Sequence, residues 1–193
     1  STPIKSSAAS DVYKRQMEYI LLLTACINPD GMPFTCLADV GVRKKQYIEA
    51  LNFYLKNTTR KIVFVENSGT DISSSFKDFQ HRIEFLCFDG NLCFDKRKGK
   101  GYGEALILEY AMAKSEFITD DVLIFKLTGR LQLININRLI HYMDKLSPSK
   151  NFVCVVPPQN NSVDSRCFVC NKYYLENIFL KDKFHIDDSV GYY

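Results

Sequence analysis

Two patterns of apolar residues alternate along this chain. A run that is apolar at nearly every position is typical of a strand covered on both faces, whereas apolar residues spaced three or four apart are typical of a helix with one buried face. The continuous runs predict strands at Tyr19–Ile27, Lys61–Glu66, Ile83–Phe88, Asp121–Leu127 and Phe152–Val156. The helical spacing predicts helices at Val42–Lys56, Glu104–Lys114, Asn135–Leu146 and Asn171–Leu180.

Strands that alternate with helices predict an α/β fold with a mostly parallel sheet covered by helices on both faces. In such sheets ligands bind beyond the carboxyl ends of the strands. The polar residues that follow each predicted strand are therefore the first candidates for a functional site.

The chain has 193 residues, 46% of them hydrophobic and 24% charged, which is typical of one globular domain. Residues 1–16 lack a sustained apolar period, and we expect them to be a non-native or disordered leader before a domain at 17–193. In that leader Lys5, Lys14 and Arg15 against Asp11 give a charge of +2, so only +1 of the total +3 belongs to the domain. A nearly neutral domain argues against a nucleic-acid partner.

The seven cysteines do not indicate a disulfide framework. Their number is odd and several lie inside apolar runs, where a thiol behaves as a small hydrophobic group, so we expect a reduced, cytoplasmic protein. Cys167 and Cys170 could form half of a zinc site, but no further pair of ligands has a suitable spacing, and we predict no metal ligands. No apolar run approaches the length of a membrane span, which leaves at most a peripheral membrane association.

The segment Lys61–Asp71 ends a buried strand in a carboxylate, and a tight turn follows it. Glu66 is followed by Asn67, Ser68 and Gly69. A carboxylate at a strand end can accept hydrogen bonds from a base N–H or a ribose hydroxyl, and the glycine permits a tight backbone turn. The alternative is an ordinary turn between a strand and a loop.

Glycines at 99, 101 and 103 directly precede the predicted helix Glu104–Lys114. Glycines before a helix N-terminus let backbone amides approach an anion, and the helix dipole favours negative charge there. Their spacing matches neither the P-loop nor the Rossmann fingerprint. The basic run Lys96–Lys98 just upstream either helps to hold a diphosphate or is a solvated loop.

The end of the predicted strand Asp121–Leu127 and the residues after it carry candidate catalytic groups. Lys126 lies near the end of this strand, and Thr128, Gly129 and Arg130 follow it. Cations there can neutralise a leaving diphosphate without a metal. A structural ion pair of Arg130 is the alternative.

Asp164 is the first candidate for a general base that deprotonates an acceptor hydroxyl, ahead of Asp187 and Asp188. Helix capping or pairing with Arg166 is the structural alternative for Asp164.

The order of elements and these segments resemble the glycosyltransferase-A family of nucleotide-sugar transferases over about Met17–Tyr193. Glu66–Asp71 is similar to the acidic strand end and Gly-Ser, Thr-Asp sequence of that family, and Lys126–Arg130 is similar to a Lys-x-Thr-Gly-Arg motif of its bacterial polysaccharide-type members. The resemblance implies catalytic roles for Lys126, Arg130 and Asp164. It implies a donor site formed by Cys26, Asn28, Glu66, Asn67, Ser68, Gly69, Gly101, Gly103, Thr128 and Gly129.

The chain departs from the family where an Asp-x-Asp pair usually holds a divalent metal on the donor diphosphate. That pair is absent here, which leaves dependence on Mg²⁺ or Mn²⁺ open. The chain also stops at Tyr193, in a segment that runs on in related enzymes, and we expect a C-terminal truncation.

The resemblance implies an enzyme that transfers a sugar from a nucleotide-sugar donor to a glycan or lipid-linked acceptor. One alternative is a nucleotidyltransferase, a class that usually carries a glycine-rich loop with Arg and Lys after its first strand. The loop here reads Asn28-Pro-Asp-Gly-Met32, which counts against that class. The other alternative is a non-catalytic nucleotide-binding module.

Overall fold

A computed structural model describes residues 18–92, 95–145, 152–154 and 164–186. In this part of the chain, six strands form one sheet in the order β3-β2-β1-β4-β6-β5. The strands are β1 (Glu18–Ala25), β2 (Lys61–Glu66), β3 (Ile83–Cys87), β4 (Val122–Thr128), β5 (Phe152–Cys154) and β6 (Cys167–Asn171). Strands β1 to β4 are parallel, whereas β6 runs antiparallel to β4 and β5 runs antiparallel to β6.

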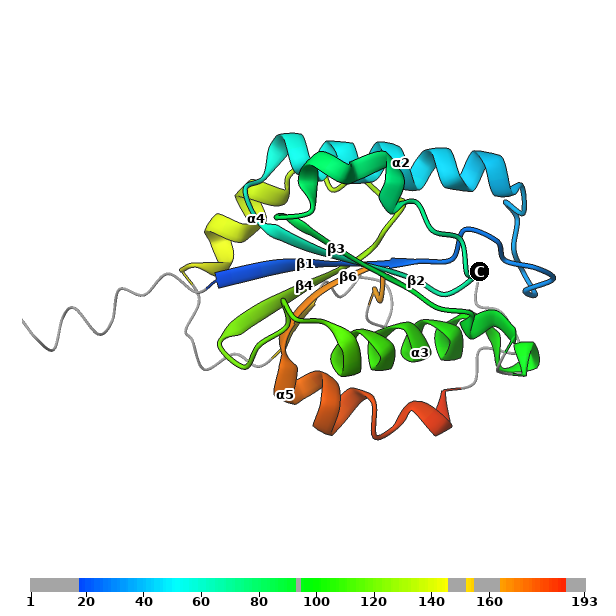
Figure 1. Ribbon diagram of the computed structural model, residues 1–193. Coiled ribbons are helices and arrows are strands. Elements are labelled where there is room, and N and C mark those ends of the chain that lie inside the picture. The colour runs from blue at the N-terminus through cyan, green and yellow to red at the C-terminus, as the bar shows by residue number, and fades with distance from the viewer. Residues whose placement is uncertain (1–17, 93–94, 146–151, 155–163, 187–193) are drawn as a thin grey trace, which may run out of the picture.

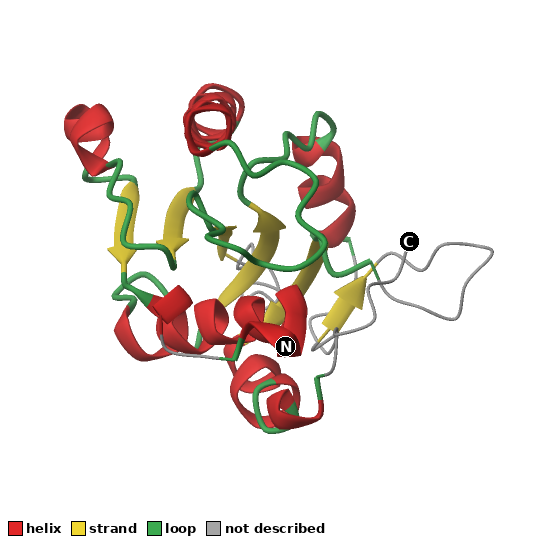
Figure 2. Ribbon diagram, turned by 90° about the vertical axis from the view of Figure 1, so that its right-hand side faces the viewer, coloured by secondary structure: helices red, strands yellow, loops and turns green. Residues whose placement is uncertain are grey.

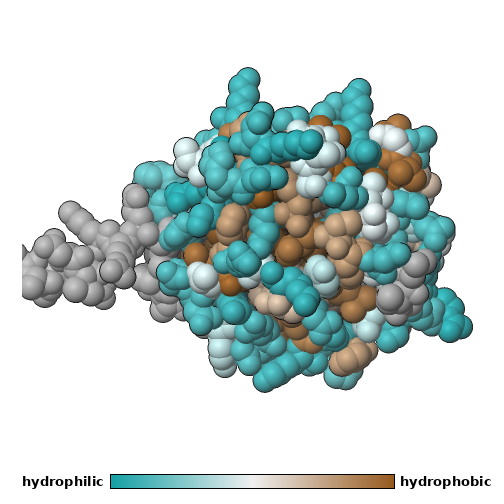
Figure 3. Space-filling model, viewed as in Figure 1, coloured by the Kyte–Doolittle hydropathy of each residue, from teal (hydrophilic) through white to brown (hydrophobic). Residues whose placement is uncertain are grey.

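Helices cover both faces of this sheet (Figure 1). Helices α2 (Val40–Asn57) and α4 (Ile136–Met143) lie on one face, and α3 (Gly99–Lys114) and α5 (Lys172–Tyr174) lie on the other. Figure 3 shows the same side of the molecule, where hydrophobic residues form a band between the two helix layers. The predicted fold class, an α/β domain with a mostly parallel, doubly covered sheet, is confirmed.

Side chains of β1 alternate between the two halves of the core. Tyr19, Leu21 and Leu23 pack on the side of α2, whereas Ile20 and Leu22 pack on the side of α3. This two-residue alternation follows from strand geometry, and it explains why the whole run is apolar. The same alternation in β4 directs Ile124 toward α3, and Lys126 lies on that face two residues later.

Two predicted elements differ strongly from those observed, whereas the ends of the others agree to within three residues. Helix α3 begins at Gly99 instead of Glu104, because the glycine-containing segment forms its first turn despite its low helix propensity. The segment predicted as a helix at Asn171–Leu180 is preceded by strand β6, which the sequence did not predict. After α5, Leu175–Phe179 forms a π-helical turn. The ends of two further predictions, Leu146 and 155–156, lie outside the described residues.

Candidate functional site

A cavity opens at the point where the direction of the sheet's connections changes. The chain passes from β1 through α2 to β2 on one side of β1, and it returns through α3 to β4 on the other side. Open α/β sheets bind ligands in the crevice at such a point. Figure 2 shows the molecule from the right-hand side of Figure 1, which is the side on which strand β1 ends. The cavity has a volume of about 490 Å³, which is within the range of small-molecule sites, and the ends of β1 and β4, the loop after β1 and the first turns of α3 line it.

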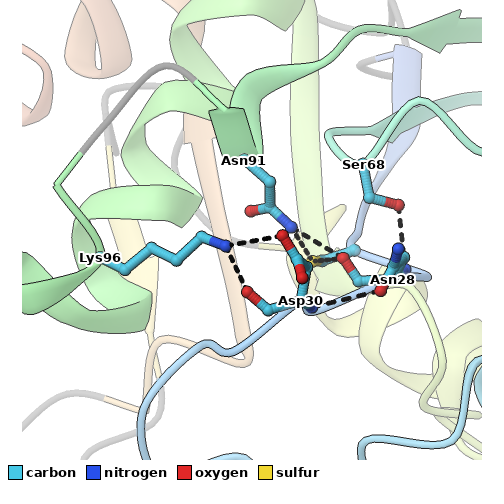
Figure 4. Close-up of polar contacts among 6 residues, drawn as sticks. Asn28, Asp30, Ser68, Asn91 and Lys96 are labelled. Carbon is cyan, nitrogen blue, oxygen red and sulfur yellow. Dashed lines mark hydrogen bonds and ion pairs between the residues drawn. The ribbon is translucent and has the colours of Figure 1, made fainter.

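Polar contacts tie the loop after β1 to its neighbours (Figure 4). The Asn28 amide N donates to Ser68 Oγ at 2.9 Å, and Asn91 Nδ2 donates to the Asn28 carbonyl at 2.7 Å. Lys96 Nζ lies 3.0 Å from Asp30 Oδ2. The predicted donor-site residues Asn28 and Ser68 therefore contact each other, and neither lines the cavity.

Glu66 stabilises the turn after β2. Its side chain is 1% exposed, and its two oxygens accept hydrogen bonds from the amides of Ile27 (2.8 Å), Ser68 (2.9 Å) and Thr70 (2.8 Å). Ser68 Oγ donates to the same carboxylate. Glu66 does not line the cavity. The nucleoside contact predicted for Glu66 stays a prediction, and in this structure its oxygens bind the chain's own backbone.

Asn67, the next residue, does line the cavity. It is 2% exposed, and within the described residues its Oδ1 accepts no hydrogen bond. A buried polar atom without a partner is unfavourable by about 1–3 kcal/mol, so such an atom in a cavity wall calls for an explanation. Gly69, with φ of 70°, takes the left-handed conformation that the turn requires, and its amide donates to the Phe88 carbonyl at 3.1 Å.

Helix α2 fixes the chain at Cys26, which also lines the cavity. Arg43 donates from Nε to the Cys26 carbonyl at 2.9 Å and from Nη1 to the Leu37 carbonyl at 3.1 Å. The Tyr47 hydroxyl accepts from the Cys26 amide at 3.0 Å. Burial raises the pKa of the Cys26 thiol and of the Tyr47 hydroxyl, so both stay protonated near neutral pH. Arg43 also lines the cavity, but its guanidinium donates to the backbone carbonyls of Cys26 and Leu37 in the cavity wall.

Arg130 and Lys100 are the cations best placed for a ligand. Arg130 is half-buried and lines the cavity, and among the described residues it forms no hydrogen bond or salt bridge. Lys100 lies in the first turn of α3, lines the cavity and donates to the Phe34 carbonyl. The glycines predicted around it, Gly101 and Gly103, also line the cavity.

The basic run upstream of α3 does not line the cavity. Lys96 contacts Asp30, and Lys98 Nζ lies 4.4 Å from the centre of the Tyr102 ring. Arg97 lies 2.7 Å from Asp95 and, through its side-chain hydrogen bonds, lowers the pKa of that carboxyl to about 2. The diphosphate contact that was predicted for the basic run Lys96–Lys98 therefore stays a prediction.

Lys126 is fully buried beneath the cavity. Its Nζ lies 2.5 Å from Glu104 Oε1 and 2.6 Å from the Ser165 carbonyl. Thr24 Oγ1 donates to the same Glu104 oxygen at 3.0 Å. Glu104, Thr24 and Ser165 line the cavity, whereas Lys126 does not. In this structure Lys126 holds Glu104 in the wall and does not face a ligand itself.

The backbone at the end of β4 lies very close to β1. The Gly129 amide donates to the Thr24 carbonyl at 2.8 Å, and a Cβ at Gly129 would lie 2.8 Å from that oxygen. Only glycine fits this approach without displacing a strand, so Gly129 has a structural role here. Thr128 lines the cavity.

Asp164 pairs with Arg166. Its Oδ2 lies 2.7 Å from Arg166 Nη2, and its Oδ1 accepts from Arg166 Nε at 2.9 Å. These hydrogen bonds hold the pKa of the Asp164 carboxyl below its usual value. Asp164 does not line the cavity, and its role as general base stays a prediction. Asp187 and Asp188 lie outside the described residues.

Cys167 and Cys170 lie three residues apart on β6. One packs against the core on the side of α2 and the other is buried on the side of α3, so they point to opposite faces. Across the described ranges, no group of three or more His, Cys, Asp or Glu residues could hold a metal ion. No helix in those ranges is long and apolar enough to cross a membrane.

Fold and cavity together define an α/β protein with a cavity at the switch point of a mostly parallel sheet. No family model matches the sequence, and no curated protein matches it significantly. Among solved structures, the fold is similar to one described as the crystal structure of 4-diphosphocytidyl-2C-methyl-D-erythritol synthase. The two chains are 11% identical with a TM-score of 0.40, and the match covers 88% of this chain and 86% of that chain. At this level the similarity concerns the arrangement of helices and strands alone.

The predicted site residues thus fall into two groups. Those that line the cavity are Cys26, Asn67, Gly101, Gly103, Thr128 and Arg130. Those that lie outside its lining are Asn28, Glu66, Ser68, Gly69, Lys126, Gly129 and Asp164. Arg43, Lys100 and Glu104 also line the cavity and were not predicted as site residues. Thr24 and Ser165, which line it too, follow predicted strands but were not singled out. One signal was present in the sequence: Lys126 interrupts a buried strand, and a buried cation requires a nearby acceptor such as Glu104.

Proposed function

We propose that the cavity binds the phosphates of a nucleotide and that the protein is a nucleotide-dependent transferase, with sugar transfer from a nucleotide sugar as its reaction. The observation that carries this proposal is Arg130. It is a cation in the wall of a cavity at the switch point, and within the described chain no hydrogen bond or salt bridge occupies it. A guanidinium presents several N–H donors in a fixed geometry that matches phosphate oxygens.

The surroundings of Arg130 suit a phosphate. Lys100 adds a second cation, and the first turn of α3 places the positive end of the helix dipole at the same cavity. Asn67 Oδ1, which accepts no hydrogen bond from the described residues, can accept one from a base N–H or a hydroxyl of the nucleotide. The volume of about 490 Å³ suits a small molecule. In this proposal Arg130 and Lys100 neutralise the departing diphosphate.

Nucleotidyl transfer is the second candidate, and one observation favours it. The loop after β1 contains no cation of its own, but Lys96 and Lys100 reach it from another segment and contact Asp30 and the Phe34 carbonyl. Two lysines thus lie where nucleotidyltransferases usually carry basic loop residues. The two reactions differ in their leaving group, because sugar transfer releases a nucleoside phosphate and nucleotidyl transfer releases pyrophosphate.

The first test is thermal stabilisation of the protein by UDP, GDP, CMP and CTP, each with and without Mn²⁺. A nucleotide at 100 times its dissociation constant should stabilise the fold by about 2.7 kcal/mol. Arg130→Ala should reduce this stabilisation strongly. Arg166→Ala is the matched control, because Arg166 is exposed, pairs with Asp164 and does not line the cavity. No stabilisation by any nucleotide, or equal losses in the two variants, would contradict the proposal.

A further inference from the structure

Among the described residues that line the cavity, Glu104 is the acidic one, in a wall that also carries cations. It lies in α3, its side chain is 24% exposed, and it lines the cavity together with Arg130 and Lys100. An unpaired carboxylate at this place would repel phosphate. Two things must therefore be explained: which group compensates the negative charge of Glu104, and what the carboxylate does in the cavity wall.

Lys126 supplies the compensating charge. Its fully buried ammonium lies 2.5 Å from Glu104 Oε1, so the pair adds no net charge to the cavity wall. The Ser165 carbonyl accepts a second hydrogen bond from Lys126, Thr24 Oγ1 donates to Glu104 Oε1, and the Lys126 Nζ lies 5.5 Å from the centre of the Phe168 ring. Both hydrogen bonds that the described residues donate to the Glu104 carboxylate go to Oε1, and Oε2 accepts none from them. The carboxylate is thus held by one oxygen, while the other remains available to a ligand.

We propose that Glu104 Oε2 accepts a hydrogen bond from a hydroxyl of the ligand's sugar, and that Lys126 is a positioning residue that holds Glu104 for this contact. A carboxylate only accepts hydrogen bonds, so it selects for groups that donate them, and sugar hydroxyls are such groups. The ligand class that follows is a diphosphate attached to a hydroxyl-bearing sugar. This inference rests on the proposed function, because Arg130 and Lys100 must first bind the phosphates.

The test compares two kinds of probe on the full chain. Inorganic pyrophosphate carries the phosphates alone, whereas UDP, GDP, ADP and CDP and their diphosphate-glucose derivatives carry sugar hydroxyls as well. Glu104→Gln can keep an oxygen toward Lys126 and Thr24 and present an amide N–H in place of Oε2. It should leave the dissociation constant of pyrophosphate unchanged or lower it, and weaken the best sugar-bearing probe by about tenfold to a hundredfold.

The role of Lys126 has its own readout. Lys126→Met leaves Glu104 as an uncompensated negative charge, so pyrophosphate binding should weaken. Adding Glu104→Gln to that variant removes the charge and should restore pyrophosphate binding. A lysine that only stabilised the fold would not give this rescue. Thermal unfolding of each variant shows that the protein measured is folded.

The outcomes separate the two proposals. If the native protein binds neither pyrophosphate nor any nucleotide probe, the proposed function fails and this inference fails with it. If the native protein binds the probes but Glu104→Gln changes none of them, or weakens pyrophosphate as much as the sugar-bearing probes, the inference fails alone. A loss confined to the sugar-bearing probes, with rescue of pyrophosphate binding in the double variant, supports it.

Discussion

Lys126 Nζ lies 2.5 Å from Glu104 Oε1, and the two partners differ sharply in exposure. The lysine side chain is fully buried, whereas the glutamate side chain is 24% exposed at the cavity. This asymmetry follows from the fold, because the alternation along β4 directs position 126 into the core toward α3. A cation inside a strand is tolerated there because the carboxylate and the Ser165 carbonyl accept its hydrogen bonds.

We therefore predict unequal effects when each partner of this pair is removed. Glu104→Ala removes the carboxylate that compensates the buried ammonium and leaves the Ser165 carbonyl as its hydrogen-bond acceptor among the described residues, so it should lower the free energy of unfolding by about 3–5 kcal/mol. Lys126→Met should lower it less, because water can reach the carboxylate of Glu104. Urea unfolding at pH 7 measures both variants, with Glu104→Gln as the control that keeps an acceptor for Lys126. Equal losses in the two variants would show that the lysine is not buried as described.

Glu66 gives a second prediction, which concerns the turn after β2. In Glu66→Gln, an amide nitrogen replaces one of the two oxygens that now accept backbone N–H groups. We expect a loss of about 1–3 kcal/mol in the free energy of unfolding. Hydrogen exchange should become faster at the amides of Ile27, Ser68 and Thr70.

Asp71→Asn is the matched control for Glu66→Gln. Asp71 is an exposed carboxylate whose Oδ1 accepts from the Ser73 amide at 2.7 Å in the same region. Its replacement should leave the exchange of the three amides near Glu66 unchanged. If both variants loosened them equally, the turn would depend on local charge in general and not on the buried carboxylate.

The parallel part of the fold was predictable because strands buried on both faces must be apolar throughout. The sequence therefore indicated β1, β2 and β4 with small errors at their ends. Strand β6 was missed because the segment Cys167–Asn171 is short and a helical turn follows it directly. Whether this segment forms a strand depends on its pairing with β4, where Phe168 lies opposite Lys126. Such a long-range contact leaves little pattern in the local sequence.

The position of the cavity was predictable, but the residues that line it were predictable only in part. The carboxyl-end rule points to the ends of β1, β2 and β4, and the cavity lies there. It does not say which polar side chain holds a loop and which faces the cavity. Glu66 and Asn67 are adjacent, yet the first binds backbone amides and the second lines the cavity. Lys100 and Glu104 were missed because their roles depend on where the first turns of α3 lie.

The pair Asp164 and Arg166 gives a prediction about pH. In the folded protein, the hydrogen bonds from Arg166 lower the pKa of Asp164 below its ordinary value of 3.8. A lowered carboxyl pKa stabilises the folded state above the unfolded value, and this contribution is lost as the pH falls through the folded pKa. Asp164→Asn should therefore be less stable than the native protein at pH 7, and the difference should shrink below pH 3.8.

The effect of Asp164→Asn should be small, about 0–1 kcal/mol, because the Arg166 side chain is 69% exposed and solvent screens the pair. Urea unfolding between pH 7 and pH 3 measures it, and Arg166→Ala should reproduce the same pH dependence. A difference that stays constant over this range would mean that Asp164 acts through packing. An assay of sugar transfer with Asp164→Asn tests its predicted role as general base separately.

Cysteine labelling tests where the ligand binds. Cys36 is exposed and lines the cavity, whereas Cys87 is exposed but does not line it. Burial, together with the nearby Glu66 charge, raises the pKa of Cys87 to about 11, so its reaction with a maleimide should accelerate as the pH rises toward that value. At pH 8, the nucleotide that stabilises the protein most should slow the labelling of Cys36 and leave the rate at Cys87 unchanged. Mass spectrometry of digested protein gives both rates in one sample. Equal protection of both thiols would indicate a general stiffening of the protein, and stabilisation without protection of Cys36 would place the nucleotide outside this cavity.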